Sequence, residues 1–197
     1  MVDHIAEGLN IKTGYNIEVI EKIDGKWRID NDGVYDKVIS TIPLPVLPIL
    51  MKLPENIVSY IKGLRYNSLI TVLFDCPKTD ITWLYIPSHD YRSHRVGYQS
   101  ALTPYANPNS ERGCGALEII GGRFEVNDKL VHDNTLPKEL GFDEILDHEF
   151  TEYAYIIHDK GYEENVKNIR EYFAKDDSFN LLGRWGTWKL RDRKSVV

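Results

Sequence analysis

The chain has 197 residues, of which 42% are hydrophobic and 27% charged, a composition ordinary for one globular domain, or for one domain plus part of another. Its formal net charge of −6 argues against nucleic acid as a partner, because such partners bind basic surfaces. No apolar run approaches the roughly 18 residues of a membrane span, and "MVDHIAEGLN" lacks the apolar centre of a signal peptide, so we expect a soluble, cytoplasmic protein without a membrane span.

Residues 2–9 place apolar side chains at helical spacing and lack a capping signal ahead of them, so they are predicted to be the last turns of a helix. Residues 17–23 and 26–29 alternate between apolar and polar, with Asp24-Gly25 between them as a hairpin signal. A second turn leads to a strand predicted over residues 35–43, which ends at Pro43. Together these segments predict a three-stranded antiparallel meander.

The middle of the chain is predicted to be mainly strand. After a proline-rich stretch, residues 54–64 predict a helix with Pro54 near its first turn. Residues 68–76 are a continuous apolar run, predicted to be a strand buried on both faces. Further strands are predicted at 81–87, 94–102 and 115–120.

The last third is predicted to contain one strand and one long helix. Residues 121–148 predict a loop followed by a short helix, and residues 149–159 predict a strand. Residues 161–175 predict a helix with an apolar stripe formed by Val166, Ile169 and Phe173. No regular βαβ crossover joins the strands, so we predict an α+β fold: the meander, then a mixed, mainly antiparallel sheet with flanking helices.

Few motifs with a chemical function are present. The two cysteines, Cys76 and Cys114, have no metal-ligand spacing and are expected to be reduced structural thiols. The six histidines do not fall at ligand spacings either, so no metal site is predicted. The sequence contains no GxGxxG followed by an acidic residue, no Walker loop and no nucleophile motif. No catalytic residue can therefore be named.

Two segments are rich in residues that bind ligands. Residues 82–105 interleave five aromatic residues with two arginines and His94, which suits a pocket for a flat or anionic ligand. The alternative is that these aromatic residues line a sheet that packs under helices. In "LLGRWGTWKL", residues 181–190, Gly183 would let the backbone approach a cofactor while Arg184 meets a phosphate or carbonyl. The alternative there is a tight turn that leads into the core.

Four segments in this order resemble FAD-dependent oxidoreductases of the amine oxidase superfamily: "EVIEKIDGKWRIDNDGVYDKVISTIPLPVLPIL", "TWLYIPSHDYRSHRVGYQSALTP", "EYAYIIHDKGYEENVKNIREYF" and "LLGRWGTWKL". The chain is most similar to the protoporphyrinogen-oxidase-like and UDP-galactopyranose-mutase-like branch, which includes many bacterial members associated with surface-sugar (polysaccharide) biosynthesis. The meander ending in D-x-V-I-x-T-x-P and the segment G-R-x-G-x-W carry the resemblance together.

The resemblance implies a division of the chain. In that family a Rossmann-type FAD domain that begins with GxGxxG precedes the first helix. Residues 1–44 would then be a remnant of the FAD-binding domain, residues 45–178 the substrate-binding domain, and residues 179–197 a return segment toward the FAD domain. Because the diphosphate-binding turn of that domain is not in the sequence, we expect FAD to be absent or weakly bound.

The resemblance also implies contact residues. Cofactor contacts are expected at Val19, Thr41, Pro43, Gly183, Arg184 and Trp188. Substrate contacts are expected at His94 and Arg95, in a cavity shaped by Trp83, Tyr85, Tyr98 and Tyr155. A nucleotide sugar would favour the arginines, because a diphosphate binds bidentate cations, whereas a hydrophobic, amine-like substrate would depend more on the aromatic walls.

Two functions stay open. The first is the substrate-binding part of a flavin-dependent oxidoreductase or sugar mutase, inactive without its dinucleotide-binding half. The second is a non-enzymatic module that binds a ligand, for example a nucleotide sugar, or another protein; a truncated reading frame is a third. We also expect Ile20, Val38 and Trp185 to expose apolar surface normally covered by an FAD domain, and so to favour self-association.

Overall fold

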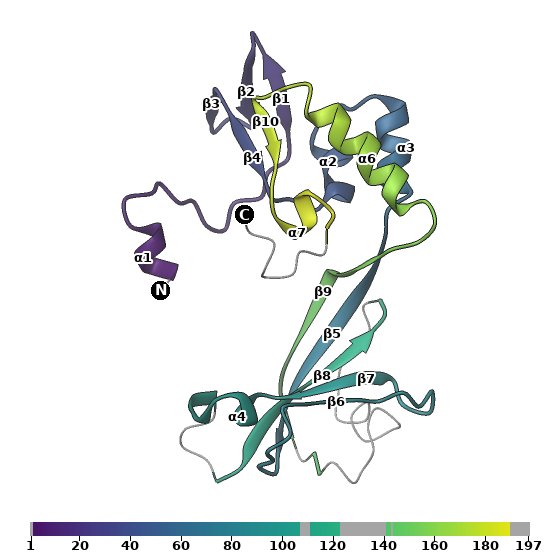
Figure 1. Cartoon of the computed structure of the whole chain (residues 1–197). Helices are drawn as coiled ribbons and strands as arrows, with labels where there is room; N and C mark the ends of the chain where they lie inside the picture. Colours follow the sequence, from purple (N-terminus) through teal and green to yellow (C-terminus); the bar gives the residue numbers. More distant parts are fainter. Residues whose placement is uncertain (1, 107–110, 123–140, 143, 190–197) are drawn as a thin grey trace. The chain divides into compact units, whose positions relative to one another are not determined.

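The computed structural model describes residues 2–106, 111–122, 141–142 and 144–189 (Figure 1). The chain forms two compact units: unit 1 comprises Met1–Leu64 and His158–Val197, and unit 2 comprises Arg65–Ile157. Unit 1 is thus built from two separate parts of the sequence, and unit 2 from one continuous part. The division into an FAD-domain remnant, a substrate-binding domain and a return segment, with boundaries after residues 44 and 178, stays a prediction.

A small antiparallel sheet lies in unit 1. It consists of β1 (Ile20–Ile23), β2 (Lys26–Ile29) and β3 (Gly33–Tyr35), in that order. The turn between β1 and β2 has φ angles of 49° at Asp24 and 81° at Gly25, the left-handed geometry that a tight hairpin needs. The predicted meander is therefore present.

The strand predicted over residues 35–43 is divided. Its second part, β4 (Val38–Ser40), leaves the meander and pairs in parallel with β10 (Phe179–Leu181). Val38 and Ser40 are buried while Ile39 between them is 65% exposed, the alternation of a strand with one covered face. The C-terminal segment thus completes unit 1.

The helices of unit 1 are α1 (Val2–Ala6), η1 (Leu44–Val46), α2 (Leu47–Leu50), α3 (Glu55–Lys62), α6 (Tyr162–Phe173) and α7 (Gly183–Gly186). Helix α6 packs against α3 (Figure 1). Its predicted apolar stripe is confirmed, because Val166, Ile169 and Phe173 are all buried. Among the described helices, none is long and apolar enough to cross a membrane.

Aromatic side chains join the parts of unit 1. The Phe179 ring centroid lies 4.9 Å from that of Trp27 on β2 and 5.3 Å from that of Phe173 on α6. The prediction of exposed apolar surface at Ile20 and Val38 is wrong, since these side chains are 3% and 9% exposed. Both face this core, because they occupy the inward positions of their short strands.

Unit 2 is a five-stranded antiparallel sheet with the strand order β6-β7-β8-β5-β9. Its strands are β5 (Arg65–Cys76), β6 (Trp83–Tyr85), β7 (Ser93–Tyr98), β8 (Gly113–Ile120) and β9 (Ile145–Ile157), with α4 (Gln99–Leu102) and η2 (Pro104–Ala106) after β7. The predicted α+β fold is confirmed. The short helix predicted before residue 148 falls mostly outside the described residues, and β9 already begins at Ile145.

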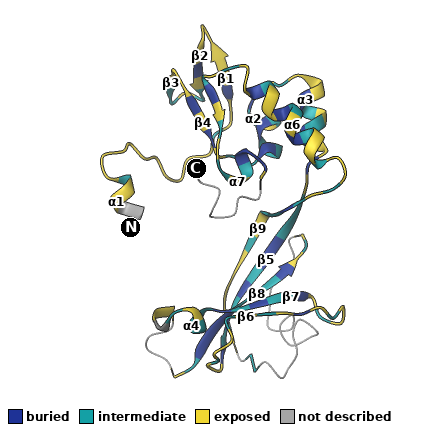
Figure 2. Cartoon of the chain, in the orientation of Figure 1, coloured by how far each residue is buried: buried dark blue, intermediate teal, exposed yellow. Residues whose placement is uncertain are grey.

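One face of the unit 2 sheet carries its hydrophobic core, dark blue along β5 and β8 in Figure 2. The core consists of Ile70, Val72, Phe74, Cys76, Ile86, Val96, Tyr98, Leu117 and Ile119. In β5 the residues between these positions are only half-buried. The prediction that this strand is buried on both faces is therefore wrong: one face is buried and the other only half-buried. The second face therefore remains able to carry polar side chains.

Candidate functional site

A polar cluster lies on the face of the unit 2 sheet opposite its core; its members are His94, Arg95, Glu118 and Tyr155. Arg95 on β7 and Glu118 on β8 are direct cross-strand partners and form an ion pair. Their neighbours Val96 and Leu117 point into the core, so the alternation of the strands directs Arg95 and Glu118 away from it. Tyr155 on β9 donates a hydrogen bond to Glu118 Oε2 at 2.6 Å and accepts one from Arg95 Nη2 at 3.1 Å.

A β-bulge places His94 beside this ion pair. The pairing between β7 and β8 shifts between Ser93 and Arg95, where two steps along β7 oppose one step along β8. Such a bulge re-aims side chains that regular alternation would send to opposite faces. As a result, His94 Nε2 lies 3.6 Å from Glu118 Oε2.

Glu118 is the centre of the cluster. Its side chain is only 17% exposed, and its two carboxylate oxygens are within reach of Arg95, Tyr155 and His94. The hydrogen bond that Arg95 donates to Glu118 raises the pKa of Arg95 above its ordinary value, so the guanidinium stays charged. The formal charges of Arg95 and Glu118 cancel, and the cluster offers paired donors and acceptors rather than an excess of positive charge.

His94 Nδ1 is a buried nitrogen that the described residues leave unsatisfied. The atom is buried and, among the described residues, has no hydrogen-bond partner. A buried polar atom without a protein partner is unusual and is commonly satisfied by water or a bound group. The histidine therefore has one nitrogen beside Glu118 and the other buried, where a bound water or small polar group would satisfy it.

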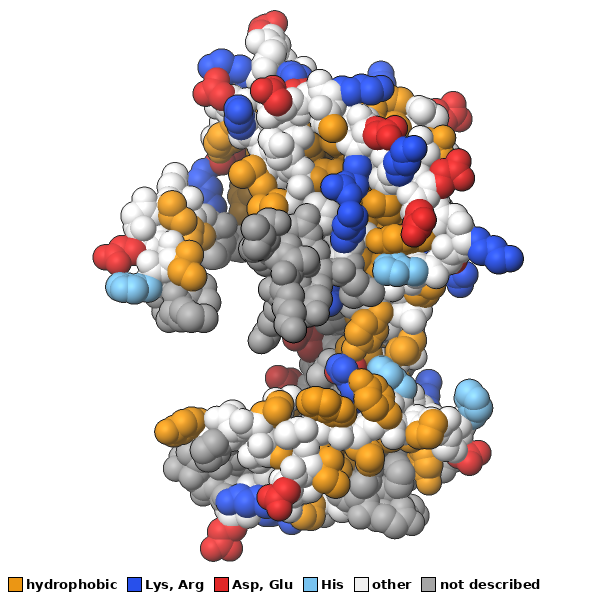
Figure 3. Space-filling model, viewed as in Figure 1, with side chains coloured by type: hydrophobic (Ala, Val, Ile, Leu, Met, Phe, Trp, Pro, Cys, Tyr) orange, Lys and Arg blue, Asp and Glu red, His pale blue; other side chains and the backbone are white. Residues whose placement is uncertain are grey.

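Two exposed aromatic rings extend the same face of the sheet. Tyr85 on β6 pairs with Arg95, and Trp83 pairs with Gly97. Directly opposite residues of antiparallel strands share a face, so both rings lie on the side of the polar cluster. Trp83 and Tyr85 are 59% and 63% exposed, and Gly97 has no side chain to cover the tryptophan. Figure 3 shows hydrophobic side chains on the surface of unit 2.

The structure brings together five of the six predicted substrate residues and leaves one out. Tyr98 is 5% exposed and belongs to the core on the opposite face. It follows Gly97 directly in β7, and successive residues of a strand point to opposite faces. Glu118 was not among the predicted substrate contacts. The signal that could have identified it is a lone carboxylate within the apolar strand "GALEII", at a position that the strand pairing places opposite Arg95.

The residues implied as cofactor contacts lie in unit 1. Val19 precedes β1, and its backbone already bonds to Asp30: its N–H donates to Asp30 Oδ1 at 2.7 Å, and its carbonyl accepts from the Asp30 N–H at 2.9 Å. Asp30 has a φ of 46°, and Tyr15 also donates to its carboxylate. In this arrangement the Val19 N–H is not available to an adenine ring.

The segment "GRWG" forms the short helix α7, which packs on the end of β4. A Cβ at Gly186 would lie 2.6 Å from the Ser40 carbonyl oxygen, so only glycine fits there. Gly183 has a φ of 77° and lies near the Thr41 side chain. Trp188 is fully buried, and its carbonyl accepts a hydrogen bond from Tyr162 at 2.5 Å.

Contacts within the chain thus explain the glycines and Trp188 without a cofactor. Pro43 caps η1 with an extended backbone. Arg184 is exposed, and within the described residues its guanidinium forms no ion pair or hydrogen bond. Of the implied set, Arg184 therefore fits a cofactor contact best. The described residues of unit 1 contain no glycine-rich turn before a long helix that could hold a diphosphate, so on their own they do not fit an FAD site.

A groove of about 810 Å³ lies beside Val19 in unit 1. It is lined by β1 and the two residues before it, by α2 and the two residues after it, and by Trp27, Tyr172 and Asp176. Lys22 crosses the groove to pair with Asp176 and lies 5.4 Å from the centre of the Trp27 ring. Within the described ranges, no group of three or more His, Cys, Asp or Glu side chains could hold a metal ion.

No protein-family model and no curated protein matches this sequence. Among solved structures, the chain is similar to a reduced UDP-galactopyranose mutase, with a TM-score of 0.75 and 20% identity over 94% of this chain and 45% of the mutase chain. It is also similar to a CLA-producing fatty acid isomerase from P. acnes, with a TM-score of 0.57 and 14% identity over 87% of this chain and 44% of the isomerase. The chain therefore shares their fold and spans less than half of their length.

Proposed function

We propose that this chain is the substrate-binding part of a flavin-dependent mutase or oxidoreductase, and that the polar cluster of unit 2 contacts the substrate. The observation that carries the proposal is the arrangement of Arg95, Glu118 and Tyr155 around one another, with His94 beside Glu118 and its buried Nδ1 unsatisfied by the described residues. The similarity in fold to a UDP-galactopyranose mutase and a fatty acid isomerase supports it.

The charge balance of the cluster favours a hydroxyl-rich ligand. Because Glu118 neutralises Arg95, the site does not offer the excess positive charge that a diphosphate needs. Sugar hydroxyls can donate to a carboxylate and accept from a guanidinium or phenol at the same time. The exposed faces of Trp83 and Tyr85 can stack on a sugar ring or a uracil base. A nucleotide sugar whose sugar moiety meets the cluster satisfies these requirements.

The reaction itself would be performed by the flavin when it is bound, by redox chemistry or by covalent chemistry on the sugar. The residues of this chain would bind and orient the substrate. We propose that a dinucleotide-binding segment outside this sequence holds FAD, and that this chain alone binds FAD weakly and is inactive. Absorption spectra after incubation with FAD and gel filtration test this part: a stoichiometric flavin spectrum would contradict it.

Calorimetric titration of the chain with UDP-galactose, in the absence of FAD, tests the substrate site. Substitution Glu118→Gln keeps the shape of the side chain but removes the negative charge that holds Arg95. We expect binding to weaken by about 10-fold or more, because a charge-assisted pair that positions the donor is lost. UDP alone should bind less tightly than UDP-galactose, because it lacks the sugar that meets the cluster.

Glu21→Gln provides the matched control. Glu21 and Arg28 are also direct cross-strand partners that form an ion pair, but they lie on β1 and β2 in unit 1. This variant should bind UDP-galactose as the unmodified chain does. Equal binding by the Glu118 variant would contradict the proposed site. Binding as tight as that of a dedicated receptor, with a dissociation constant on the order of 1 μM, would favour the non-enzymatic module.

A further inference from the structure

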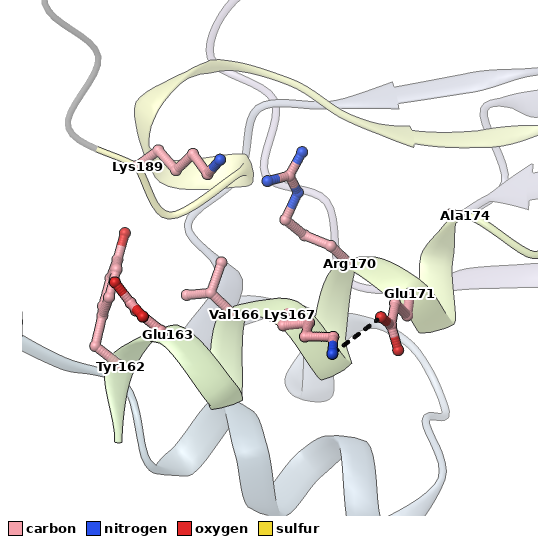
Figure 4. A pocket seen from close by; sticks show the side chains of 8 residues that line it. All are labelled: Tyr162, Glu163, Val166, Lys167, Arg170, Glu171, Ala174 and Lys189. Atoms are coloured by element: carbon pink, nitrogen blue, oxygen red, sulfur yellow. Dashed lines mark ion pairs between the residues drawn. The ribbon is translucent and has the colours of Figure 1, made fainter. Parts of the chain in front are cut away.

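A second cavity, of about 540 Å³, lies in unit 1 along one side of helix α6, far along the chain from the polar cluster. Its lining residues are Tyr162, Glu163, Val166, Lys167, Arg170, Glu171, Ala174 and Lys189 (Figure 4). All but Lys189 come from α6 or its end. The floor is apolar, because Val166 is buried and Ala174 has only a methyl group.

The cavity brings two cations together without a carboxylate between them. In Figure 4, the side chains of Arg170 and Lys189 point toward each other over the opening. Among the described residues, no ion pair engages either of them, whereas the neighbouring Lys167 lies 3.9 Å from Glu171. Glu163 lies beside Tyr162, at the other end of the cavity from Arg170 (Figure 4). Like charges that converge are unfavourable unless an anion joins them.

The position of Lys189 is set by the backbone that carries it. The Lys189 N–H donates to the Arg184 carbonyl at 3.0 Å, which closes the turn after α7. Just before it, Trp188 is fully buried with a φ of 50°, and its carbonyl accepts the Tyr162 hydroxyl at 2.5 Å. These contacts tie the turn to the start of α6. They also occupy the Tyr162 hydroxyl, so its ring is the part available to a ligand.

We propose that this cavity binds a phosphate monoester on an apolar or aromatic group. Arg170 can hold two phosphate oxygens in its planar fork, and Lys189 adds a point charge from the opposite side. The apolar floor and the ring of Tyr162 cover the body of the ligand. The site is separate from the polar cluster of unit 2 and does not depend on the function proposed for that cluster.

Phenyl phosphate tests the site in calorimetry at low ionic strength. The double variant R170Q/K189Q should bind at least about 10-fold more weakly than the unmodified chain, because it loses two charge-assisted contacts. The control K37Q/K62Q removes the same charge from exposed positions of unit 1 that do not line the cavity, and should bind as the unmodified chain does. Circular dichroism and urea unfolding check that both variants fold.

Vesicles distinguish a free phosphate ester from a lipid headgroup. The same variants are sedimented with phosphatidylcholine vesicles that contain phosphatidic acid. If the unmodified chain binds phenyl phosphate and R170Q/K189Q binds it more weakly, the ligand is a soluble phosphate ester. If the unmodified chain binds only the vesicles, and the double variant binds them more weakly, the ligand is a lipid headgroup. The proposal is overturned if the unmodified chain binds neither probe, or if R170Q/K189Q is affected no more than the control.

Discussion

At the residue scale, Gly186 shows how closely α7 approaches β4. A Cβ at this position would lie 2.6 Å from the Ser40 carbonyl oxygen. The same carbonyl accepts a hydrogen bond from the Leu182 N–H at 2.9 Å. We expect Gly186→Ala to lower the free energy of unfolding by about 1–3 kcal/mol, because backbone rather than a flexible side chain must move. Urea unfolding measures the change.

Gly161→Ala is the control for this substitution. A Cβ there would meet atoms at 3.5 Å and 3.8 Å, which are ordinary contacts, and the φ of Gly161 is −90°. Its effect should stay within about 0.5 kcal/mol, as for most surface substitutions. If the two alanines destabilised the chain equally, the close approach of α7 to β4 would not be the cause.

The lowered pKa of Asp176 makes the stability of the fold depend on pH in the acid range. Hydrogen bonds from Lys22 first, and then from Ser178, lower its pKa from 3.8 to about 2. A depressed carboxyl pKa stabilises the fold fully above pH 3.8, and that stabilisation is lost as the pH falls from 3.8 toward about 2. The side chain is 33% exposed, so solvent keeps the effect small.

The variant Asp176→Asn should therefore be less stable than the unmodified chain at pH 6 and should lose less stability between pH 4 and 2. The measurement is the urea midpoint at several pH values. Parallel profiles for the two proteins would show that the Lys22 contact does not perturb Asp176. Asp177→Asn serves as the control, because Asp177 is the next residue along the chain and forms no ion pair among the described residues.

At the element scale, local patterns predicted most helices and strands. The stripe of α6 and the hairpin turn at Asp24-Gly25 follow from spacing and turn chemistry alone. The parallel pairing of β4 with β10 could not be predicted, because each strand has three residues and their partners are far apart in the sequence. Pairings of this kind depend on tertiary packing rather than on local preference.

The candidate site shows the same limit. The sequence marked Trp83, Tyr85 and Arg95 as candidate ligand contacts, but not which face of the sheet each occupies. The bulge at His94 turns one residue toward Glu118, whereas regular alternation sends Tyr98 into the core. A shift of one residue in strand register decides whether a side chain joins the polar cluster or the core.

The unit 2 sheet depends on Phe74 in its central strands. This side chain is fully buried, and its ring fills the space over Gly115, where a Cβ would lie 2.4 Å from it. Phe74→Ala should lower the free energy of unfolding of unit 2 by about 3–5 kcal/mol, the range for deleting a buried ring. Tyr105→Ala, at an 83% exposed position of the same unit, should have little effect. Comparable losses would show that the core is elsewhere.

At the scale of the whole molecule, each unit has its own core, and each should respond to its own substitutions. Phe74→Ala should increase hydrogen exchange mainly in β5 and β8. Ile169→Ala, which removes a fully buried side chain of α6, should increase it mainly in α3 and α6. Mass spectrometry of exchanged peptides measures both. Uniform acceleration across both units by either substitution would contradict independent cores.

The central claim is that unit 2 carries the substrate site, and the tryptophan indoles test it most directly. Of the four tryptophans, only Trp83 lies in unit 2; Trp27, Trp185 and Trp188 lie in unit 1. In a ¹⁵N-labelled chain, addition of UDP-galactose should move the indole N–H signal of Trp83 and leave the other three unchanged. A shift of Trp27, Trp185 or Trp188 with Trp83 unmoved, or no shift at all, would contradict the claim.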